Sequence, residues 1–207
     1  MKVAKKRVYR SLIRQKQAGE TRTRIISAAR KLLEERGYAG MTMEAVARKA
    51  GVAVATVYAI FGSKTGIVSA ILDAARFGSQ YQDLVREAMQ TADPRARLKF
   101  AARIPRRIYE SESSVMDLLR GAKAVAPNLA FAEAERDCQR YDSQKGLVQY
   151  LVQTRSLRPG LTMERARDIL WTLTSRDVYR MLVGERGWTA QEYEDWLSEA
   201  IVERLIG

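Results

Sequence analysis

Apolar positions along the chain recur mostly three and four residues apart, the spacing that places side chains on one face of an α-helix. The first clear segment begins at Thr21 and ends at Arg36-Gly37, a cation followed by a helix-ending glycine. Residues 1–20 are polar and basic without a clear apolar face, which predicts a mobile arm or a frayed helical extension. Residues 52–61 alternate and are β-branched, but no partner strand lies within reach. We therefore expect a helix there and an all-helical chain.

Short helices are predicted after the first segment. Thr42 is a suitable N-cap for a helix that ends at Gly51. A second short helix is expected from about residue 53 to residue 61, and Ser63 can cap a longer helix after it.

Longer amphipathic helices are predicted in the remainder of the chain. Asp93-Pro94 begins the first of them, and Pro105 is expected to kink it. Thr162 is expected to cap one helix, and Thr189 with Glu192 forms a capping box for the last. The later helices are expected over roughly 112–125, 128–155, 162–183 and 189–206. No internal repeat or low-complexity linker interrupts this pattern.

Positive charge is concentrated at one end of the chain. Residues 1–64 hold 15 Lys and Arg against 4 Asp and Glu, whereas the remaining residues hold 21 against 20. Such a field attracts a polyanion such as DNA, RNA or an anionic lipid surface. The longest uncharged stretch in the basic part is the 14 residues 50–63, shorter than the roughly 20 residues that span a bilayer. We therefore expect a soluble, cytoplasmic protein without a membrane partner.

Composition excludes several enzyme classes. The 207 residues include no His and a single Cys, Cys138. A Ser-His-Asp triad, a Cys-His pair, an imidazole metal site and an intrachain disulfide are therefore impossible. Paired carboxylates at useful spacing and a phosphate-cradling glycine loop are also missing from the sequence. We expect neither catalysis nor a metal or cofactor.

The two short helices joined by Ala50-Gly51-Val52 form a predicted helix-turn-helix. Small residues such as Ala47 allow the two helices to cross closely, and Gly51 accepts the left-handed turn. Val57 and Phe61 anchor the second helix from within. That helix can then lie in a DNA major groove with its first residues at base edges.

Residues 21–72 resemble the DNA-binding domain of the TetR family of bacterial transcriptional regulators. The most distinctive features are the tyrosine, phenylalanine and lysine of the recognition helix and the segment after it. The resemblance implies a three-helix DNA-binding head, a helical body with an inducer pocket, and a homodimer joined through the last two long helices. The residues that carry it are Thr21-Arg22, Ile25, Ala28-Ala29, Leu33, Gly37-Tyr38, Thr42-Met43, Val46-Ala47, Ala50-Gly51-Val52, Thr56-Val57-Tyr58, Phe61 and Ser63-Lys64.

The resemblance also implies roles at the DNA. Thr42, Tyr58 and Lys64 would contact phosphates, and Arg22 belongs to the same expected surface. The basic arm would add phosphate or minor-groove contacts, with Arg7, Arg10 and Arg14 as candidates. The groove-facing positions are Ala53, Val54, Ala55, Thr56 and Ala59.

The groove-facing positions depart from many relatives. These relatives often carry Ser, Lys, Arg, Gln or His there, and an aromatic residue or His commonly stands where this chain has Ile60. Thr56 is the main hydrogen-bonding side chain left among them. Base readout is therefore expected to depend on thymine methyls, water and DNA shape.

No motif marks the effector pocket or the dimer interface. Polar or aromatic residues on otherwise apolar faces are the pocket candidates, and two wide apolar stripes near the end of the chain predict self-association. Those stripes could instead cover the core of the body. The pocket candidates are Arg103, Tyr109, Met116, Arg120, Tyr141 and Trp171. The interface candidates are Ile169, Leu173, Val178, Leu182, Tyr193, Trp196, Leu197 and Ile201.

The sequence thus predicts three parts: a basic arm (1–20), a helix-turn-helix domain (21–65) and an effector-binding and dimerisation domain (66–207). The leading hypothesis is a dimeric repressor that binds palindromic operator DNA and is released by a small-molecule effector. The alternative is a basic helical module that binds nucleic acid or a membrane surface without an inducer, through residues 2–16.

Overall fold

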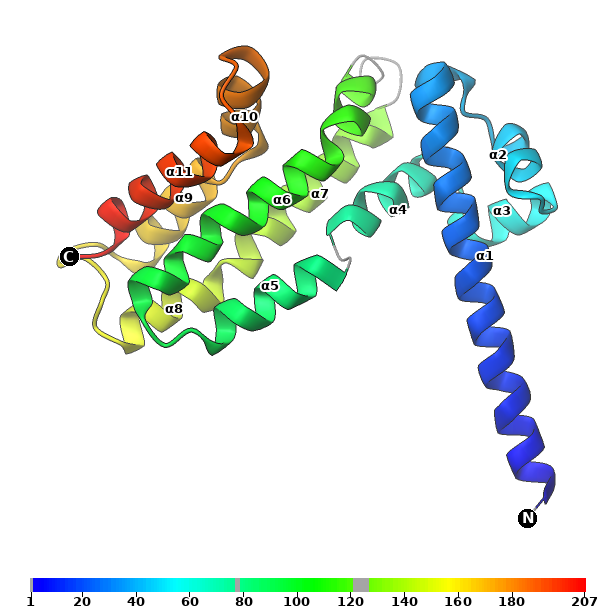
Figure 1. The fold of residues 1–207 in the computed structure, drawn as a ribbon, viewed down its shortest axis with the longest axis horizontal. Coiled ribbons are helices and arrows are strands. Elements are labelled where there is room, and N and C mark those ends of the chain that lie inside the picture. The colour runs from blue at the N-terminus through cyan, green and yellow to red at the C-terminus, as the bar shows by residue number, and fades with distance from the viewer. Residues whose placement is uncertain (1, 77–78, 121–126) are drawn as a thin grey trace. The chain divides into compact units, whose positions relative to one another are not determined.

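The structure, a computed structural model, consists of helices throughout the residues it describes (Figure 1). It describes the backbone of residues 2–76, 79–120 and 127–207. Within these ranges it leaves out the side chains of residues 2–14, 75–76, 79–80, 113–114, 117–118, 120, 127–128 and 132. No strand occurs in this part of the chain, apart from an isolated antiparallel bridge between Leu157 and Ile206. The all-helical prediction is confirmed, including at residues 52–61.

The helices follow one another with short connections. The first four are α1 (Lys2–Gly40), α2 (Met43–Ala50), α3 (Val54–Phe61) and α4 (Lys64–Arg76). The next four are α5 (Ser79–Gln90), α6 (Pro94–Arg120), α7 (Pro127–Ser143) and α8 (Lys145–Gln153). The last are α9 (Met163–Leu173), α10 (Arg176–Tyr179), the π-helix η1 (Arg180–Glu185) and α11 (Ala190–Leu205).

The chain forms two compact units. The first, here called the head, comprises Met1–Ala74 and Ser114–Leu129, and the second, the body, comprises Ala75–Ser113 and Ala130–Gly207. Helix α6 supplies residues to both units. The other boundaries between the units fall near the end of α4 and near the start of α7.

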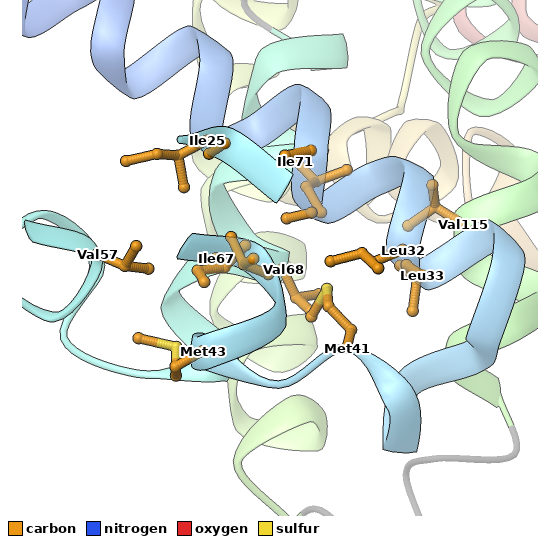
Figure 2. Close-up of a cluster of buried hydrophobic side chains, with 14 of the residues drawn as sticks. Ile25, Leu32, Leu33, Met41, Met43, Val57, Ile67, Val68, Ile71 and Val115 are labelled. Atoms are coloured by element: carbon orange, nitrogen blue, oxygen red, sulfur yellow. The ribbon is translucent and has the colours of Figure 1, made fainter. Parts of the chain in front are cut away.

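The head is built on a single apolar cluster (Figure 2). Ile25 and Leu33 of α1, Val57 of α3 and Ile67 of α4 are fully buried in it. Val115 of α6 joins the same cluster and is 1% exposed. Each buried aliphatic side chain of this kind contributes about 1.5–3 kcal/mol, so this cluster fixes how α1 to α4 pack.

Helix α1 continues through the boundary at residue 20. It begins at Lys2 and runs to Gly40, with non-helical torsions at Gly37 (φ 67°, ψ −179°). Of the two forms expected for residues 1–20, the backbone adopts the helical extension over the described residues 2–20. The division into an arm, a domain at 21–65 and a body at 66–207 stays a proposal.

One helix replaces the two that we expected between residues 93 and 125. Asp93 caps α6, because its Oδ2 accepts a hydrogen bond from the N–H of Ala96 at 2.6 Å. The helix runs on past Pro105 without interruption. The helix start expected near Glu112 is wrong, because Glu112 lies inside α6. The hydroxyl of Ser111 donates to the carbonyl of Ile108 within the same helix, at 2.8 Å.

Two predicted long helices are instead broken. The helix expected over 128–155 splits into α7 and α8 at Gln144. The helix expected over 162–183 splits at Thr174 into α9, α10 and η1. Both long-helix predictions were wrong. At the second break, Ser175 Oγ accepts from the N–H of Val178 at 3.3 Å and caps α10, which is a local signal. The two breaks also contact each other, since Gln144 Nε2 donates to Thr174 Oγ1 at 2.8 Å.

The predicted caps at Thr162 and Thr189 are confirmed. Thr162 Oγ1 accepts from the N–H of Arg165 at 3.2 Å. Thr189 and Glu192 form the complete capping box at the start of α11, with Glu192 Oε2 accepting from the N–H of Thr189 at 2.7 Å. These bonds satisfy N–H groups that have no partner inside a helix.

The body has its own apolar core. It gathers fully buried side chains from α6, α8, α9 and α11, which include Leu98, Leu151, Leu170 and Leu197. No single helix in the described residues is long and apolar enough to cross a membrane. One pair bent by 66°, Val54–Phe61 with Lys64–Ala74, passes that test by length and composition alone.

Candidate DNA-binding surface and interior polar cluster

The start of α2 is a capped helix end at the surface of the head. Thr42 is exposed, and its Oγ1 accepts a hydrogen bond from the N–H of Ala45 at 3.1 Å. Glu44 lies in the first turn and Arg48 and Lys49 in the last, which matches the helix dipole. The remaining N–H groups of this first turn can donate to an anion.

The turn between α2 and α3 follows the predicted geometry. Gly51 adopts φ 65° and ψ 43°, the left-handed conformation that glycine occupies without a steric penalty. The N–H of Val52 donates to the carbonyl of Ala47 at 3.0 Å, which closes a Schellman-type helix end. Ala47 and Ala50 are buried where the two helices cross. The predicted helix-turn-helix is therefore present in the head.

Helix α3 packs against the core of the head through a few side chains, and most of its other side chains are exposed. Val57 is fully buried, and Phe61 packs against the same core. Val54 and Tyr58 are 37% and 48% exposed. The other candidate groove positions, Ala53, Ala55 and Ala59, are exposed, and Thr56 is half-buried. The structure thus brings all these sequence-predicted positions onto one short helix of the head.

The beginning of α4 packs tightly against the end of α3. Ser63 Oγ accepts from the N–H of Gly66 at 3.1 Å, which confirms Ser63 as a cap. A side chain at Gly66 would place its Cβ 2.0 Å from the carbonyl oxygen of Phe61. Only glycine fits this close approach, and the sequence analysis missed it. A glycine in the first turn of a predicted helix was the available signal.

Lys64 is held in place by two contacts. Its ammonium lies 4.0 Å from the centroid of the Tyr38 ring and donates to the carbonyl of Ala39 at 3.3 Å. Partial burial lowers the pKa of Lys64 from its ordinary value. The sequence predicted Lys64 but not the aromatic ring of Tyr38, which restricts where this charge can reach.

Arg22 lies against the end of α3. Its guanidinium is 5.3 Å from the centroid of the Phe61 ring, a cation–π contact that places this turn of α1 beside α3. The side chains of the other arm candidates, Arg7, Arg10 and Arg14, lie outside the described residues.

Thr174 is the centre of an interior polar cluster in the body. Its Oγ1 accepts from Gln144 Nε2 at 2.8 Å and from Arg140 Nη1 at 3.0 Å, and it donates to the carbonyl of Leu170 at 2.7 Å. The carbonyl of Thr174 accepts from the hydroxyl of Tyr109 at 2.8 Å. Four elements, α6, α7, α9 and the α7–α8 break, therefore meet at one threonine.

A buried ion pair adjoins this cluster. Glu112 is 2% exposed and pairs with Arg176, whose guanidinium lies 4.5 Å from the centroid of the Tyr109 ring. Breaking a buried pair of this kind by removing one partner costs about 3–5 kcal/mol. Burial raises the pKa of Tyr109, so its hydroxyl remains a donor. The cluster therefore includes a carboxylate, Glu112, whose charge is balanced by the guanidinium of Arg176.

Three tyrosine rings pack beside these polar groups. The rings of Tyr109 and Tyr179 are 5.6 Å apart, and those of Tyr179 and Tyr193 are 4.9 Å apart. The hydroxyl of Tyr193 is buried and has no hydrogen-bond partner among the described residues. Burial also raises the pKa of Tyr193. An unpaired buried hydroxyl is unusual and costly, which marks this position as a candidate contact for a bound molecule.

The structure brings only some of the predicted effector residues together. Tyr109 and Trp171 are linked through Thr174 and Arg140: Tyr109 donates to the carbonyl of Thr174, and Arg140 Nη1 donates to Thr174 Oγ1 and to the carbonyl of Trp171, the latter at 2.5 Å. Tyr141 instead approaches Asp168 at 3.4 Å. Arg103 lies over the ring of Phe100, Met116 packs against the core of the head, and the side chain of Arg120 lies outside the described residues.

The predicted interface residues fall into two groups. Tyr193, Leu197 and Ile201 are fully buried inside the single chain, so they form the body's own core. The others are half-buried and pack at the edge of that core, and they are Ile169, Leu173, Val178, Leu182 and Trp196. Met181, between Val178 and Leu182, is 43% exposed.

Comparisons with known proteins agree with this geometry. Residues 25–76 match the family model described as bacterial regulatory proteins, tetR family. The chain is 28% identical over 172 residues to the HTH-type transcriptional regulator YdeS of Bacillus subtilis, covering 79% of each protein.

Solved structures share the fold over nearly the whole chain. The regulator FadR from Bacillus subtilis, in complex with stearoyl-CoA, superposes with a TM-score of 0.67 at 17% identity, covering 88% of this chain and 98% of FadR. NalD, the secondary repressor of the MexAB-OprM multidrug efflux pump in Pseudomonas aeruginosa, superposes with a TM-score of 0.67 at 21% identity, covering 91% and 98%. The helix-turn-helix geometry and the family match lead to one conclusion: residues 25–76 form a DNA-binding domain similar to that of the tetR family of bacterial regulatory proteins.

Proposed function

We propose that this regulator is a dimeric repressor that binds palindromic operator DNA and dissociates from it when a small molecule binds the body. The observation that carries the proposal is the exposed helix α3 beside the capped start of α2, both held on the buried core of the head. An exposed second helix of this kind fits a major groove. The similarity to NalD, described as a repressor, favours repression over activation.

The DNA contacts follow from the positions of the polar groups. Thr42 and the free N–H groups at the start of α2 bind one phosphate, and Tyr58 and Lys64 bind others. Arg22 lies close enough to α3 to act at the same surface. Arg7 and Arg10 belong to the basic extension of α1 and contribute flanking contacts.

Dimerisation is supported by the apolar residues at the edge of the body's core. Ile169, Leu173, Val178, Leu182 and Trp196 are half-buried in the single chain, and Met181 is exposed among them. A second copy would bury this surface further and place two heads for the two half-sites of a palindrome. Tyr193, Leu197 and Ile201 support the interface only by filling the core behind it.

The effector is proposed to act at the interior polar cluster. Helix α6 carries Tyr109 and Glu112 in the body and, one turn further on, Val115 in the core of the head. A molecule that bonds to the Tyr193 hydroxyl or displaces a partner of Thr174 would favour one position of this helix over another. The difference in affinity for the two positions then sets DNA release.

The proposal is tested by selecting duplexes from a random library with the full-length protein. We expect an inverted-repeat motif, and binding to it that weakens steeply with salt because Lys and Arg displace counterions. Affinity would be measured by fluorescence anisotropy at several salt concentrations. Recovery of no motif, or binding insensitive to salt, contradicts the proposal.

A truncation separates the head from its basic extension. Deleting residues 2–18 should weaken binding to every duplex, while the selected motif should stay preferred over a scrambled one. Variants Thr42→Ala and Tyr58→Phe in the full-length chain should weaken binding as well. Loss of all binding in the truncated protein, with no effect of either substitution, would favour the alternative of a basic helical module.

The effector route is tested without knowing the effector. Thr174→Val removes the hydroxyl that joins Gln144 and Arg140, and should change DNA affinity at least threefold. Thr172→Val is the matched control, since its exposed hydroxyl donates to the carbonyl of Asp168 in its own helix at 2.8 Å. Equal DNA affinities of the two variants would contradict a role of the Thr174 hydroxyl in controlling DNA binding.

A further inference from the structure

Helix α3 carries no charged side chain. The uncharged stretch runs from Ala50 to Ser63 and includes the whole helix and both of its turns. Within α3, Thr56 and Tyr58 supply the only side-chain hydrogen-bonding groups. Direct readout of G·C pairs relies mainly on Arg, Lys, Asp or Glu, and readout of adenine on Asn or Gln. None of these six residue types occurs in α3.

The exposed positions of α3 are instead apolar. Ala55 and Ala59 are each two positions from the buried Val57, on the far side of the helix from the core. Val54 in the first turn is 37% exposed, and Ile60 is 36% exposed. A surface helix usually turns a polar face to water, so an apolar outward face indicates that something apolar covers it.

Cations lie around α3 rather than on it. Arg48 and Lys49 end the helix before it, and Lys64 begins the helix after it. Lys49 is already paired with Glu35 at 2.8 Å, which leaves Arg48 and Lys64 as the nearer phosphate contacts. The cations beside α3 would therefore attract the DNA backbone, whereas the side chains of α3 itself would contact the base edges.

We propose that α3 reads operator DNA chiefly through the 5-methyl groups of thymine, which Val54, Ala55 and Ala59 contact. The inference rests on the proposed function, because it needs α3 to lie in a major groove. The thymine methyl is the one apolar group that the four standard bases present in that groove. The half-site is accordingly rich in A·T pairs at the positions that α3 covers, with the hydroxyl of Thr56 as an adaptable polar contact.

Deoxyuridine tests this directly, since it pairs as thymine does but lacks the 5-methyl group. Each thymine of the selected operator is replaced in turn by deoxyuridine, and full-length protein is titrated by anisotropy. We expect about fourfold weaker binding at two or more positions of each half-site, the value of one buried methyl group. Unchanged affinity at every position, within twofold, would overturn the inference.

A substitution on α3 identifies the contact. Ala55→Ser adds a hydroxyl to the Cβ that would contact the thymine methyl, so the deoxyuridine penalty at its partner base should fall from about fourfold to less than twofold. Ala134→Ser, on an exposed position of α7, is the matched control and should keep the full penalty.

Two failures can be told apart. A salt-sensitive protein that selects an inverted repeat with G·C pairs under α3, or that ignores deoxyuridine, retains the proposed function and refutes methyl readout. A protein that selects no sequence refutes the proposed function, and the inference falls with it. In either case the truncated protein lacking residues 2–18 reports whether the basic extension alone causes the binding.

Discussion

The ammonium group of Lys64 lies over the ring of Tyr38, 4.0 Å from its centroid, and also donates to the carbonyl of Ala39. The two residues come from different helices, α4 and α1, and are 26 positions apart in the sequence. A cation stacked on an aromatic ring loses few conformations when it binds a phosphate. The end of α1 therefore positions the charge of Lys64, for which we propose a phosphate contact.

Replacing Lys64 by Gln should weaken binding to all duplexes to a similar degree. Because one phosphate contact is lost, the slope of log affinity against log salt should fall by about 1. The measurement is anisotropy at four or more salt concentrations. Lys99→Gln, at an exposed position of the body, controls for net charge and should change neither quantity. An unchanged slope for Lys64→Gln would show that this lysine does not bind a phosphate.

Thr42 and Thr162 allow a matched test of capping against DNA contact. Each threonine caps its helix through one hydrogen bond, at 3.1 and 3.2 Å. Replacement by Ala should cost about 1 kcal/mol of unfolding free energy in each case, measured by urea denaturation. Only Thr42→Ala should also weaken DNA binding, by about fivefold or more. Equal DNA affinities of the two variants would remove Thr42 from the interface.

Removing the hydroxyl of Tyr109 and removing that of Tyr193 should have different effects on the stability of the protein. Tyr109→Phe deletes a bond to the Thr174 carbonyl and should destabilise the protein by about 1–2 kcal/mol. Tyr193→Phe deletes a buried hydroxyl without a partner in the described residues, so stability should stay the same or rise. Thermal and urea unfolding measure both. Destabilisation by Tyr193→Phe would mean that this hydroxyl has a partner, such as a bound water.

The capping box at α11 should make stability depend on pH. The pKa of Glu192 lies below its ordinary value because the backbone and hydroxyl of Thr189 donate to its carboxylate. A carboxyl whose pKa is depressed by folding stabilises the protein above its unfolded pKa, and this stabilisation is lost as the pH falls through the folded value. Unfolding at pH 7 should therefore distinguish wild type from Glu192→Gln.

The same comparison provides its own control at low pH. Once Glu192 is protonated in both the folded and unfolded states, the wild type and Glu192→Gln should unfold at nearly the same denaturant concentration. A difference between them that stays constant from neutral to acid pH would show that the carboxylate charge has no part in the cap.

Met181 and Met89 test the dimer interface. Both are exposed, at 43% and 68%, but only Met181 lies within the proposed apolar surface. A glutamate at position 181 would bury an unpaired charge on association, so Met181→Glu should raise the dimer dissociation constant at least tenfold. Met89→Glu should leave it unchanged. Sedimentation velocity over a range of concentrations gives both values, and a dimer unaffected by Met181→Glu would place the interface elsewhere.

Local rules allowed the head to be predicted in detail. The caps at Thr42 and Ser63 and the left-handed turn at Gly51 depend on residues within about four positions of each other, so their signals are contained in the sequence. The periodic apolar residues of α1 and the anchor Val57 also follow from spacing alone. The sequence by itself therefore determined the helix-turn-helix, its exposed positions and its concentrated positive charge.

Tertiary structure decided what depends on residues far apart in the chain. The side chains at the two helix breaks, Gln144 and Thr174, meet across 30 positions, and the pair of Glu112 with Arg176 spans 64. Burial likewise removed Tyr193 from the predicted interface and placed it in the core. The physical reason is the same in each case: a side chain's partner and its share of the core are set by how separate helices pack, which no local pattern records.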